Sequence, residues 1–314
     1  MEKANVSVLN NFYLIELSNL PEVRISLFVM ILLVYLITLA GNGAILMAIG
    51  TDVHLHTPMY FFLSNLSFLD VLCPTVTVPK MLQIFMSEDK TIPFSGCVLQ
   101  FFFLIDVVGT EIFLLAVMAY DRYVAICSPL QYASIMNTRL CAQLAAGTWI
   151  AGFINSLVHT SLTFTLSFCG SNQIHQYYCD IPPVLALAYS STYITELVVL
   201  LVAGILGSSA FVVTLISYIY IISAILRMPS AEGRHKAFST CGSHLTVVCL
   251  FYGATMFTYA RPTSAYSPKH DRIVSMLYGI ITPMLNPMIY SLRNKEVKRA
   301  LVKVLRLKSC LRSD

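Results

Sequence analysis

LVVLLVAGILGSSAFVVTLISYIYIISAIL, which spans residues 197–226, contains no Asp, Glu, Lys or Arg. A helix that crosses a bilayer needs about 20 mostly apolar residues, and 18 or more with few charges is the usual threshold. Four other stretches are equally free of these charged side chains: residues 25–49, 140–166, 237–260 and 273–292. Each of the five stretches is therefore long enough to span a membrane as a helix.

Two further stretches are apolar but hold isolated acidic residues. Residues 58–79 carry only Asp70, and residues 98–120 carry only Asp106 and Glu111. With them the sequence predicts seven spans. The fold class that follows is an all-α integral membrane protein, a seven-transmembrane helix bundle.

The overall composition agrees with this interpretation. The chain is 57% hydrophobic and 11% charged, whereas soluble domains carry roughly 25% charged residues. A large soluble protein with a very apolar core is the alternative, but the long uncharged runs favour lipid as the solvent. We divide the chain into an N-terminal segment (1–24), which we expect to be extracellular, a domain of seven transmembrane helices (25–292) and a C-terminal segment (293–314), which we expect to be cytoplasmic.

The distribution of Lys and Arg predicts the orientation in the membrane. These residues accumulate in short cytoplasmic loops. Thirteen of the 20 lie on the side of the C-terminus and seven on the other side, so we expect a plasma-membrane protein with its N-terminus outside. Asn5-Val6-Ser7 is then an outward glycosylation acceptor. No feature indicates a nucleic-acid partner.

Cysteines on the outer side are candidates for a disulfide, because extracellular loops face an oxidising compartment. Cys97 begins the third predicted span, and Cys169 and Cys179 lie in the long outer loop. A Cys97–Cys179 bridge would hold that loop over the bundle. A metal site at His175, Cys179 and Asp180 is disfavoured, since loop spacing fixes no coordination geometry.

Ionisable groups at membrane depth are functional candidates. Asp70 lies about 18 Å into the second span and Glu111 about 21 Å into the third, at 1.5 Å per residue. Because these spans enter from opposite sides, the two carboxyl groups are expected to meet near mid-depth. Two close carboxylates cannot both stay ionised without a cation. We favour a sodium ion with Asn42 and Asn286 as further ligands; a neutral hydrogen-bonded pair is the alternative.

Asp106 lies nearer the outer side of the third span. Two interpretations stay open for it. It either lines a pocket or faces a neighbouring helix in its protonated form.

Residues at the inner ends of the spans form a candidate activation switch. Asp121-Arg122-Tyr123 ends the third span, where Asp121 would hold the Arg122 guanidinium until a partner takes it. Simple snorkelling of the arginine to the membrane surface is the alternative. In Asn286–Tyr290, Pro287 removes a helix hydrogen bond and predicts a bend. Tyr290, and Tyr218 on the fifth span, could then move toward Arg122.

Several longer motifs occur in a fixed order along the chain. They are Asn42, Asp70, Pro58–Leu63 (PMYFFL), Met118–Cys127 (MAYDRYVAIC), Trp149, Lys236–Cys241 (KAFSTC) with Ser243-His244, Phe251-Tyr252-Gly253 and Pro283–Tyr290 (PMLNPMIY). Together they resemble rhodopsin-like (class A) G-protein-coupled receptors, and within these the olfactory receptors of the tetrapod class. The resemblance runs from about residue 20 to residue 300.

The resemblance implies a function. A non-enzymatic receptor is expected to bind small volatile odorants among the outer halves of spans three to seven. It is expected to activate the olfactory stimulatory G protein, to raise cyclic AMP and to reside in sensory cilia. The chain also departs from the family pattern: Tyr189 stands where the usual partner of Cys169 would be, and Gln176 replaces a frequent His. A second loop disulfide is therefore not expected.

Apolar and hydroxyl side chains at helical spacing, at positions that match the family's pocket, form the candidate ligand site. They are Leu104, Ile105, Val108, Gly109, Ile112, Val202, Ala203, Leu206, Tyr252, Thr255, Met256, Tyr259 and Gly279. Such a mostly apolar cavity suits small organic ligands. At roughly 25 cal/mol per Å² of buried area, a small odorant should bind with micromolar or weaker affinity.

The C-terminal segment is predicted to form a short basic amphipathic helix over Asn294–Leu307, with Val297, Leu301, Val304 and Leu305 toward lipid. Cys310 either carries palmitate or stays a free thiol.

Three other functions are possible for a chain with these spans. A small-molecule transporter would show inverted repeats and broken helices, an intramembrane enzyme would need a nucleophile and base, and another class A receptor would bind a non-odorant ligand. The sequence shows neither the repeats and broken helices of a transporter nor the nucleophile and base of an enzyme. The motif Lys236–Cys241 argues against a class A receptor for a non-odorant ligand.

Overall fold

Seven membrane-crossing segments make up the structure, a computed structural model that describes residues 10–15, 21–168, 172–260, 267–293, 296–300 and 302. Single helices form the first four spans and the sixth: α1 (Pro21–Thr51), α2 (Pro58–Met86), α3 (Phe94–Cys127), α5 (Thr138–Phe164) and α9 (Ala231–Tyr259). Each of the other two contains a π-helical segment. The fifth span is α7 (Tyr193–Val202), η2 (Ala203–Gly207) and α8 (Ser208–Leu226), and the seventh is α10 (Pro268–Met276), η4 (Leu277–Ile281) and α11 (Thr282–Arg293).

The predicted fold class is confirmed. Six helices of the described chain are long and apolar enough to cross a membrane. The seventh span is divided into shorter pieces by η4, and Pro287 lies inside α11. π-Segments of this kind interrupt α-helices frequently at functional sites.

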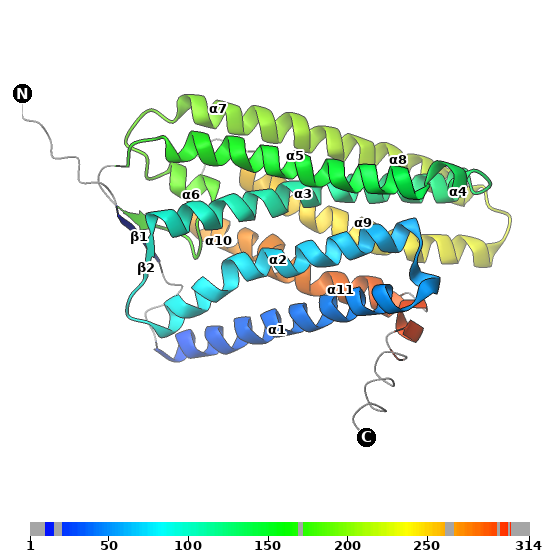
Figure 1. Cartoon of the computed structure of the whole chain (residues 1–314), viewed down its shortest axis with the longest axis horizontal. Helices are drawn as coiled ribbons and strands as arrows, with labels where there is room; N and C mark the ends of the chain where they lie inside the picture. Colours follow the sequence, from blue (N-terminus) through cyan, green and yellow to red (C-terminus); the bar gives the residue numbers. More distant parts are fainter. Residues whose placement is uncertain are drawn as a thin grey trace, which may run out of the picture.

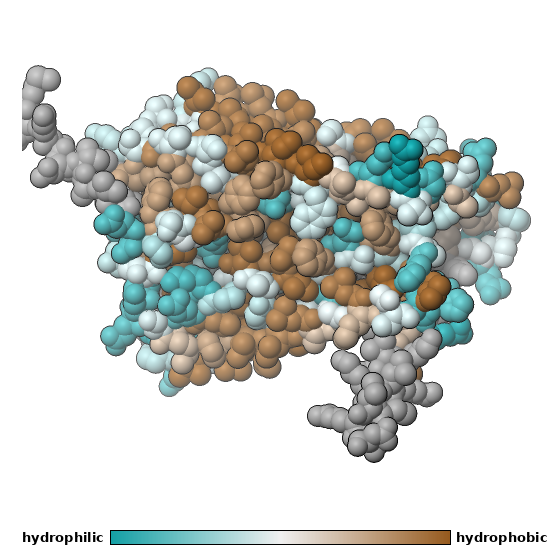
Figure 2. All heavy atoms as spheres, viewed as in Figure 1, coloured by the Kyte–Doolittle hydropathy of each residue, from teal (hydrophilic) through white to brown (hydrophobic). Residues whose placement is uncertain are grey.

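The helices run along the long axis of the molecule, as Figure 1 shows. Strands β1 (Asn11–Leu14) and β2 (Thr91–Pro93) lie at one end, which we call the sheet end, and α4 (Tyr132–Ile135) lies at the opposite end, the α4 end. On the visible face, apolar side chains cover most of the middle and hydrophilic ones gather toward both ends (Figure 2). This pattern is the one expected of a surface that meets lipid between two aqueous phases.

The third span is the central element of the bundle, and it packs closely on α5. A Cβ atom at Gly152 of α5 would lie 2.1 Å from the Thr110 hydroxyl oxygen and 2.8 Å from the Asp106 carbonyl oxygen. No side chain fits there. Small residues that let two backbones approach are typical of helix contacts in membranes.

A three-stranded sheet at the sheet end was not predicted from the sequence. β1 lies between β2 and β3 (Gln173–Ile174), antiparallel to β2 and parallel to β3. Its alternation buries Phe12 and Leu14, and the Phe12 ring contacts the Phe94 and Phe168 rings. Four residues are too short to show a strand pattern without their partners.

The outer loop after α5 is fastened to the third span. The expected disulfide between Cys97 and Cys179 is present. The Cys179 backbone N–H also donates to the Gln100 side-chain oxygen at 2.9 Å, and the Gln100 amide donates to the Val76 carbonyl at 3.0 Å. The loop then forms α6 (Ile181–Leu185), which lies over the bundle interior.

Connections at the α4 end are short. The 3-10 turn η1 (Val53–Leu55) joins α1 to α2, and α4 precedes α5. Residues 296–300, in the predicted amphipathic segment, are helical. Val297 is fully buried there, so its predicted lipid-facing position was wrong: the side chain packs inward against the bundle. Leu301, Val304 and Leu305 lie outside the described side chains.

Candidate functional site

A cavity of about 190 Å³ lies in the half of the bundle nearer the sheet end. Its wall comes from α3, α5, the fifth span and α9, and Ile181 of α6 contributes from the loop. Most lining side chains are apolar, as is usual for small-molecule sites. The candidate ligand residues that the structure brings together here are Ile105, Val108, Gly109, Ile112, Val202, Leu206, Tyr252, Thr255, Met256 and Tyr259.

The remaining three candidates are placed differently. Leu104 is fully buried but does not line the cavity. Gly279 lies in η4 beside the Tyr178 hydroxyl, because a Cβ there would be 3.6 Å from it. The side chain of Ala203 lies outside the described ones. Asp106 does not line the cavity either, and its buried Oδ1 atom has no hydrogen-bond partner among the described residues.

The contribution of the fourth span, α5, to the cavity wall was not predicted from the sequence. Asn155 and His159 of α5 line the cavity, and both are polar residues within an uncharged span. The rule that polar groups at membrane depth are functional candidates, which singled out Asp70 and Glu111, applies to Asn155 and His159 too. Ile181 had no comparable signal, because its position depends on how the outer loop folds back.

The hydroxyl groups with which the sixth span lines the cavity donate hydrogen bonds to protein atoms. Tyr252 donates to the Ile112 carbonyl of α3 at 2.8 Å, and Thr255 donates to the carbonyl of Phe251 within its own helix at 2.8 Å. Tyr259 donates to Asp180 at 2.9 Å. The cavity wall on α9 is thereby tied both to α3 and to the outer loop.

Asp180 closes the site at the sheet end. Its buried carboxylate accepts hydrogen bonds from the hydroxyls of Tyr259 and Tyr278 and from the Ile181 backbone N–H, at 2.7–2.9 Å. Desolvation by burial raises the pKa of Asp180, although these donors partly oppose the rise. One loop residue therefore joins α6, the sixth span and the seventh span above the cavity.

The four candidate ion ligands are all buried. The Asn286 amide donates to both carboxylate oxygens of Asp70, at 2.9 and 3.0 Å. The Asn42 amide donates to the Thr38 and Pro283 carbonyls. Both Glu111 carboxylate oxygens, and the amide oxygens of Asn42 and Asn286, have no hydrogen-bond partner among the described residues. This set offers several oxygen donors of the kind that hard cations bind.

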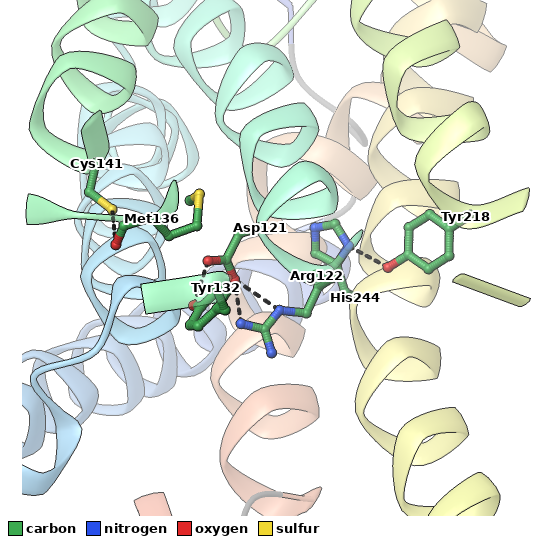
Figure 3. Close-up of polar contacts among 7 residues, drawn as sticks. All are labelled: Asp121, Arg122, Tyr132, Met136, Cys141, Tyr218 and His244. Carbon is green, nitrogen blue, oxygen red and sulfur yellow. Dashed lines mark hydrogen bonds and ion pairs between the residues drawn. The ribbon is translucent and has the colours of Figure 1, made fainter. Parts of the chain in front are cut away.

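The arginine of the third span is held at the α4 end, as Figure 3 shows. The Arg122 guanidinium forms an ion pair with Asp121. Asp121 in turn accepts a 2.7 Å hydrogen bond from the Tyr132 hydroxyl of α4. The neighbouring loop thus stabilises the carboxylate that holds the arginine.

The other candidate switch residues lie nearby, but none of those described bonds to Arg122. The Tyr218 hydroxyl pairs with His244 Nδ1 and lies 3.4 Å from the Cys241 carbonyl oxygen, while the Tyr123 ring contacts Tyr120 and Tyr220. Figure 3 shows the Tyr218–His244 pair on the side of Arg122 away from Tyr132. Pro287 is buried in α11 beside Gly41. The side chain of Tyr290 lies outside the described ones.

Three other predicted positions lie outside the described residues: Asn5, Cys169 and Cys310. Within the described chain no group of three or more His, Cys, Asp or Glu side chains is arranged to hold a metal ion.

Comparison with known proteins gives a consistent result. The olfactory receptor family model matches residues 31–308. Mouse olfactory receptor 5AP2 is 50% identical over 305 residues, which cover 97% of this chain and 96% of that receptor. Human olfactory receptor 5AR1 is 48% identical over 309 residues, which cover 98% of this chain and 100% of that receptor. Human olfactory receptor 5A1 is 50% identical over 304 residues, which cover 97% of this chain and 96% of that receptor. With its bundle of membrane-spanning helices, the chain belongs to the olfactory receptor family, multi-pass plasma-membrane G-protein-coupled receptors that are not enzymes.

Proposed function

We propose that this receptor binds a small volatile organic molecule in the cavity and activates the olfactory stimulatory G protein, which raises cyclic AMP. One observation carries the proposal: α9 links the cavity to the other end of the bundle. Tyr252 and Tyr259 line the cavity, and His244 of the same helix pairs with Tyr218. Eight residues separate Tyr252 from His244, about 12 Å at 1.5 Å per residue.

The bonds made by α9 suggest how a ligand acts. Tyr252 is bonded to α3 through the Ile112 carbonyl, and Tyr259 is bonded to the loop through Asp180. A ligand among these side chains changes the position of α9 relative to α3. Because packed helices move as units rather than deforming locally, the change reaches His244 and Tyr218.

The resting state is the one with Arg122 paired to Asp121. Tyr218, Ile221, Ile225 and Cys241 form a buried cluster that joins the fifth and sixth spans next to Ala119 of α3. This closed cluster limits how far a protein partner can insert between these helices toward Arg122. Outward movement of α9 opens it and frees the guanidinium for the G protein.

The proposed orientation places the sheet end outside the cell and the α4 end in the cytoplasm. The Cys97–Cys179 disulfide lies at the sheet end, which is consistent with an oxidising compartment. The excess of Lys and Arg on the other side supports the same orientation. The Arg122 switch then faces the compartment that contains the G protein.

We also propose that sodium binds between Asp70 and Glu111 in the resting receptor. Glu111 is 1% exposed and lacks a hydrogen-bond partner among the described residues. A buried carboxylate is costly unless it is paired or protonated, and a cation satisfies both acids.

Cyclic AMP measurements test the proposed function. Cells that express the receptor with the olfactory stimulatory G protein are exposed to a panel of odorants, beside cells that express Arg122→Ala. We expect at least one odorant to raise cyclic AMP through the unmodified receptor and none through the variant at equal surface expression. Odorant uptake without a cyclic AMP response would indicate a transporter instead.

A further inference from the structure

We propose that His159 and Asn155 form a polar subsite that recognises the oxygen atom of a neutral alcohol or carbonyl odorant. The inference rests on the proposed function, which it narrows to a class of ligand. Some polar groups of the cavity wall already make hydrogen bonds within the protein, and others do not; the inference follows from this difference.

The hydroxyl groups of the wall have their hydrogens engaged. Those of Tyr252, Thr255 and Tyr259 donate to Ile112, to the sixth span itself and to Asp180, as described above. The Ser208 hydroxyl donates to the Ile205 carbonyl at 3.3 Å. None of the four has a hydrogen left for a ligand unless it gives up a bond within the protein.

His159 differs from these groups. It lines the cavity and is only 2% exposed, and its Nδ1 atom is buried without a hydrogen-bond partner among the described residues. An unsatisfied buried polar atom costs roughly 1–3 kcal/mol, so such an atom requires an explanation. Because no described protein group bonds to Nδ1, this nitrogen can pair with a polar ligand atom without breaking a bond within the protein.

Asn155 lies one helical turn before His159 and lines the same wall. Its amide extends over Gly109 of α3, since a Cβ at Gly109 would lie 3.2 Å from Asn155 Nδ2. Gly109 therefore provides the space that the amide occupies. The side chains at i and i+4 share one helix face, so the amide and the imidazole are presented to the cavity together.

The chemistry of this pair selects the ligand. A neutral imidazole has one donor and one acceptor nitrogen, and an amide has two donor hydrogens and an acceptor oxygen. A hydroxyl group can donate to one and accept from the other, and a carbonyl oxygen can accept from both. A carboxylate is disfavoured because no Lys or Arg is among the described lining residues and an unpaired charge is costly in an apolar cavity.

A series of ligands with one carbon skeleton tests the subsite. Cyclooctane, cyclooctanol, cyclooctanone and cyclooctanecarboxylic acid differ only in the functional group. Binding to the purified full-length receptor is followed by the shift in thermal unfolding temperature with ligand concentration, which requires no G protein. The same ligands are applied to cells for cyclic AMP.

We expect the alcohol or the ketone to bind roughly tenfold more tightly than the hydrocarbon, a difference of about 1.4 kcal/mol that one hydrogen bond can supply. His159→Phe keeps a ring of similar size without the nitrogens, so it should remove this preference. The affinity of the variant for cyclooctane should stay within about twofold of that of the unmodified receptor. Ser161→Ala is the matched control: Ser161 lies on the same helix, is exposed and does not line the cavity, and its hydroxyl donates to the Leu157 carbonyl, so the preference should remain. If His159→Phe does not reach the cell surface, Asn155→Leu gives the same test.

The outcomes separate the two proposals. Ligand-dependent stabilisation that favours the oxygenated compounds, without any cyclic AMP response, would support the subsite and contradict the proposed function. An unchanged preference in His159→Phe, or in Asn155→Leu where it replaces that variant, would overturn the subsite while leaving the receptor function in place. Failure of both oxygenated compounds to stabilise the unmodified receptor, or a preference for cyclooctane or the acid, would overturn it too.

Discussion

Tyr259, in the last turn of the sixth span, donates a 2.9 Å hydrogen bond to the buried carboxylate of Asp180 in the outer loop. Tyr278 of the seventh span donates to the other oxygen of the same carboxylate. The loop that the Cys97–Cys179 disulfide fixes to the third span is thereby connected to both the sixth and the seventh span. The position of the sixth span depends on a residue that belongs to no span.

The Asp180 contact predicts a pH dependence of stability. Burial raises the pKa of Asp180 above its ordinary value near 4. The folded receptor therefore holds the proton more tightly than the unfolded chain, and this contribution to stability is lost as pH rises through the folded-state pKa. Asp180→Asn keeps an acceptor for the tyrosines but cannot ionise.

We expect the unfolding temperature of the purified receptor to rise as pH is lowered toward the ordinary carboxyl pKa near 4, with a smaller rise for Asp180→Asn. Thermal unfolding at several pH values in one detergent measures both slopes. Identical slopes for the two proteins would show that Asp180 does not contribute.

Tyr132→Phe should raise the signalling activity measured without ligand. The Tyr132 hydroxyl donates a 2.7 Å hydrogen bond to Asp121, the residue that holds Arg122. A hydrogen bond to a charged group contributes about 1.5–3 kcal/mol, so its loss weakens the resting arrangement. Basal cyclic AMP at matched surface expression measures the effect.

Tyr220→Phe is the control for this substitution, because Tyr220 is 56% exposed and contacts Tyr123 through its ring. Its basal activity should equal that of the unmodified receptor. Equal basal activity in Tyr132→Phe would mean that α4 does not restrain the switch.

Gly152→Ala should destabilise the bundle. The added Cβ would lie 2.1 Å from the Thr110 hydroxyl oxygen and 2.8 Å from backbone atoms of α3. Forcing an extra carbon into a close-packed contact costs about 1–3 kcal/mol. Gly147→Ala, on the same helix, meets nothing within 4 Å and should be tolerated.

Surface expression and thermal unfolding of the two glycine variants give the comparison directly. A Gly152→Ala receptor as stable as Gly147→Ala would show that α3 and α5 are less tightly packed than described.

Sodium should stabilise the receptor without ligand. At a sodium concentration ten times the dissociation constant, binding to the folded state alone adds about 1.4 kcal/mol. We expect a higher unfolding temperature in sodium chloride than in choline chloride, and no difference for Glu111→Gln, which lacks the charge that attracts the ion. A sodium effect that survives in Glu111→Gln would place the ion elsewhere, and no effect in either protein would favour a neutral pair.

The fold was predictable because lipid imposes a simple pattern. Charged side chains are costly at membrane depth, so five spans appear as uncharged runs such as 197–226 and two as apolar runs with isolated acids. The π-segment Ala203–Gly207 within that run has no such signature. The strand β1 has no such signature either, because its four residues form a strand only by pairing with β2 and β3.

Helical spacing together with the family's pocket positions predicted Ile105, Ile112, Tyr252 and Tyr259 as cavity residues, and all four line the cavity from α3 and α9. The contribution of His159 was not predicted, because the choice of α5 as a wall depends on how close α3 and α5 approach. Asp180 was considered only as a metal ligand. Its contacts with the sixth and seventh spans arise from the path of the outer loop, which periodicity does not encode.

The most direct test of the account is an odorant dose-response curve measured as cyclic AMP for the unmodified receptor and for Val108→Phe. Val108 lines the cavity from α3, and the larger ring would occupy the space of the ligand. We predict a curve that saturates at micromolar or higher odorant concentration and is lost in Val108→Phe, with both proteins equally present at the cell surface. An unchanged curve in Val108→Phe, or saturation at low nanomolar odorant, would contradict the assignment of this cavity as the ligand site.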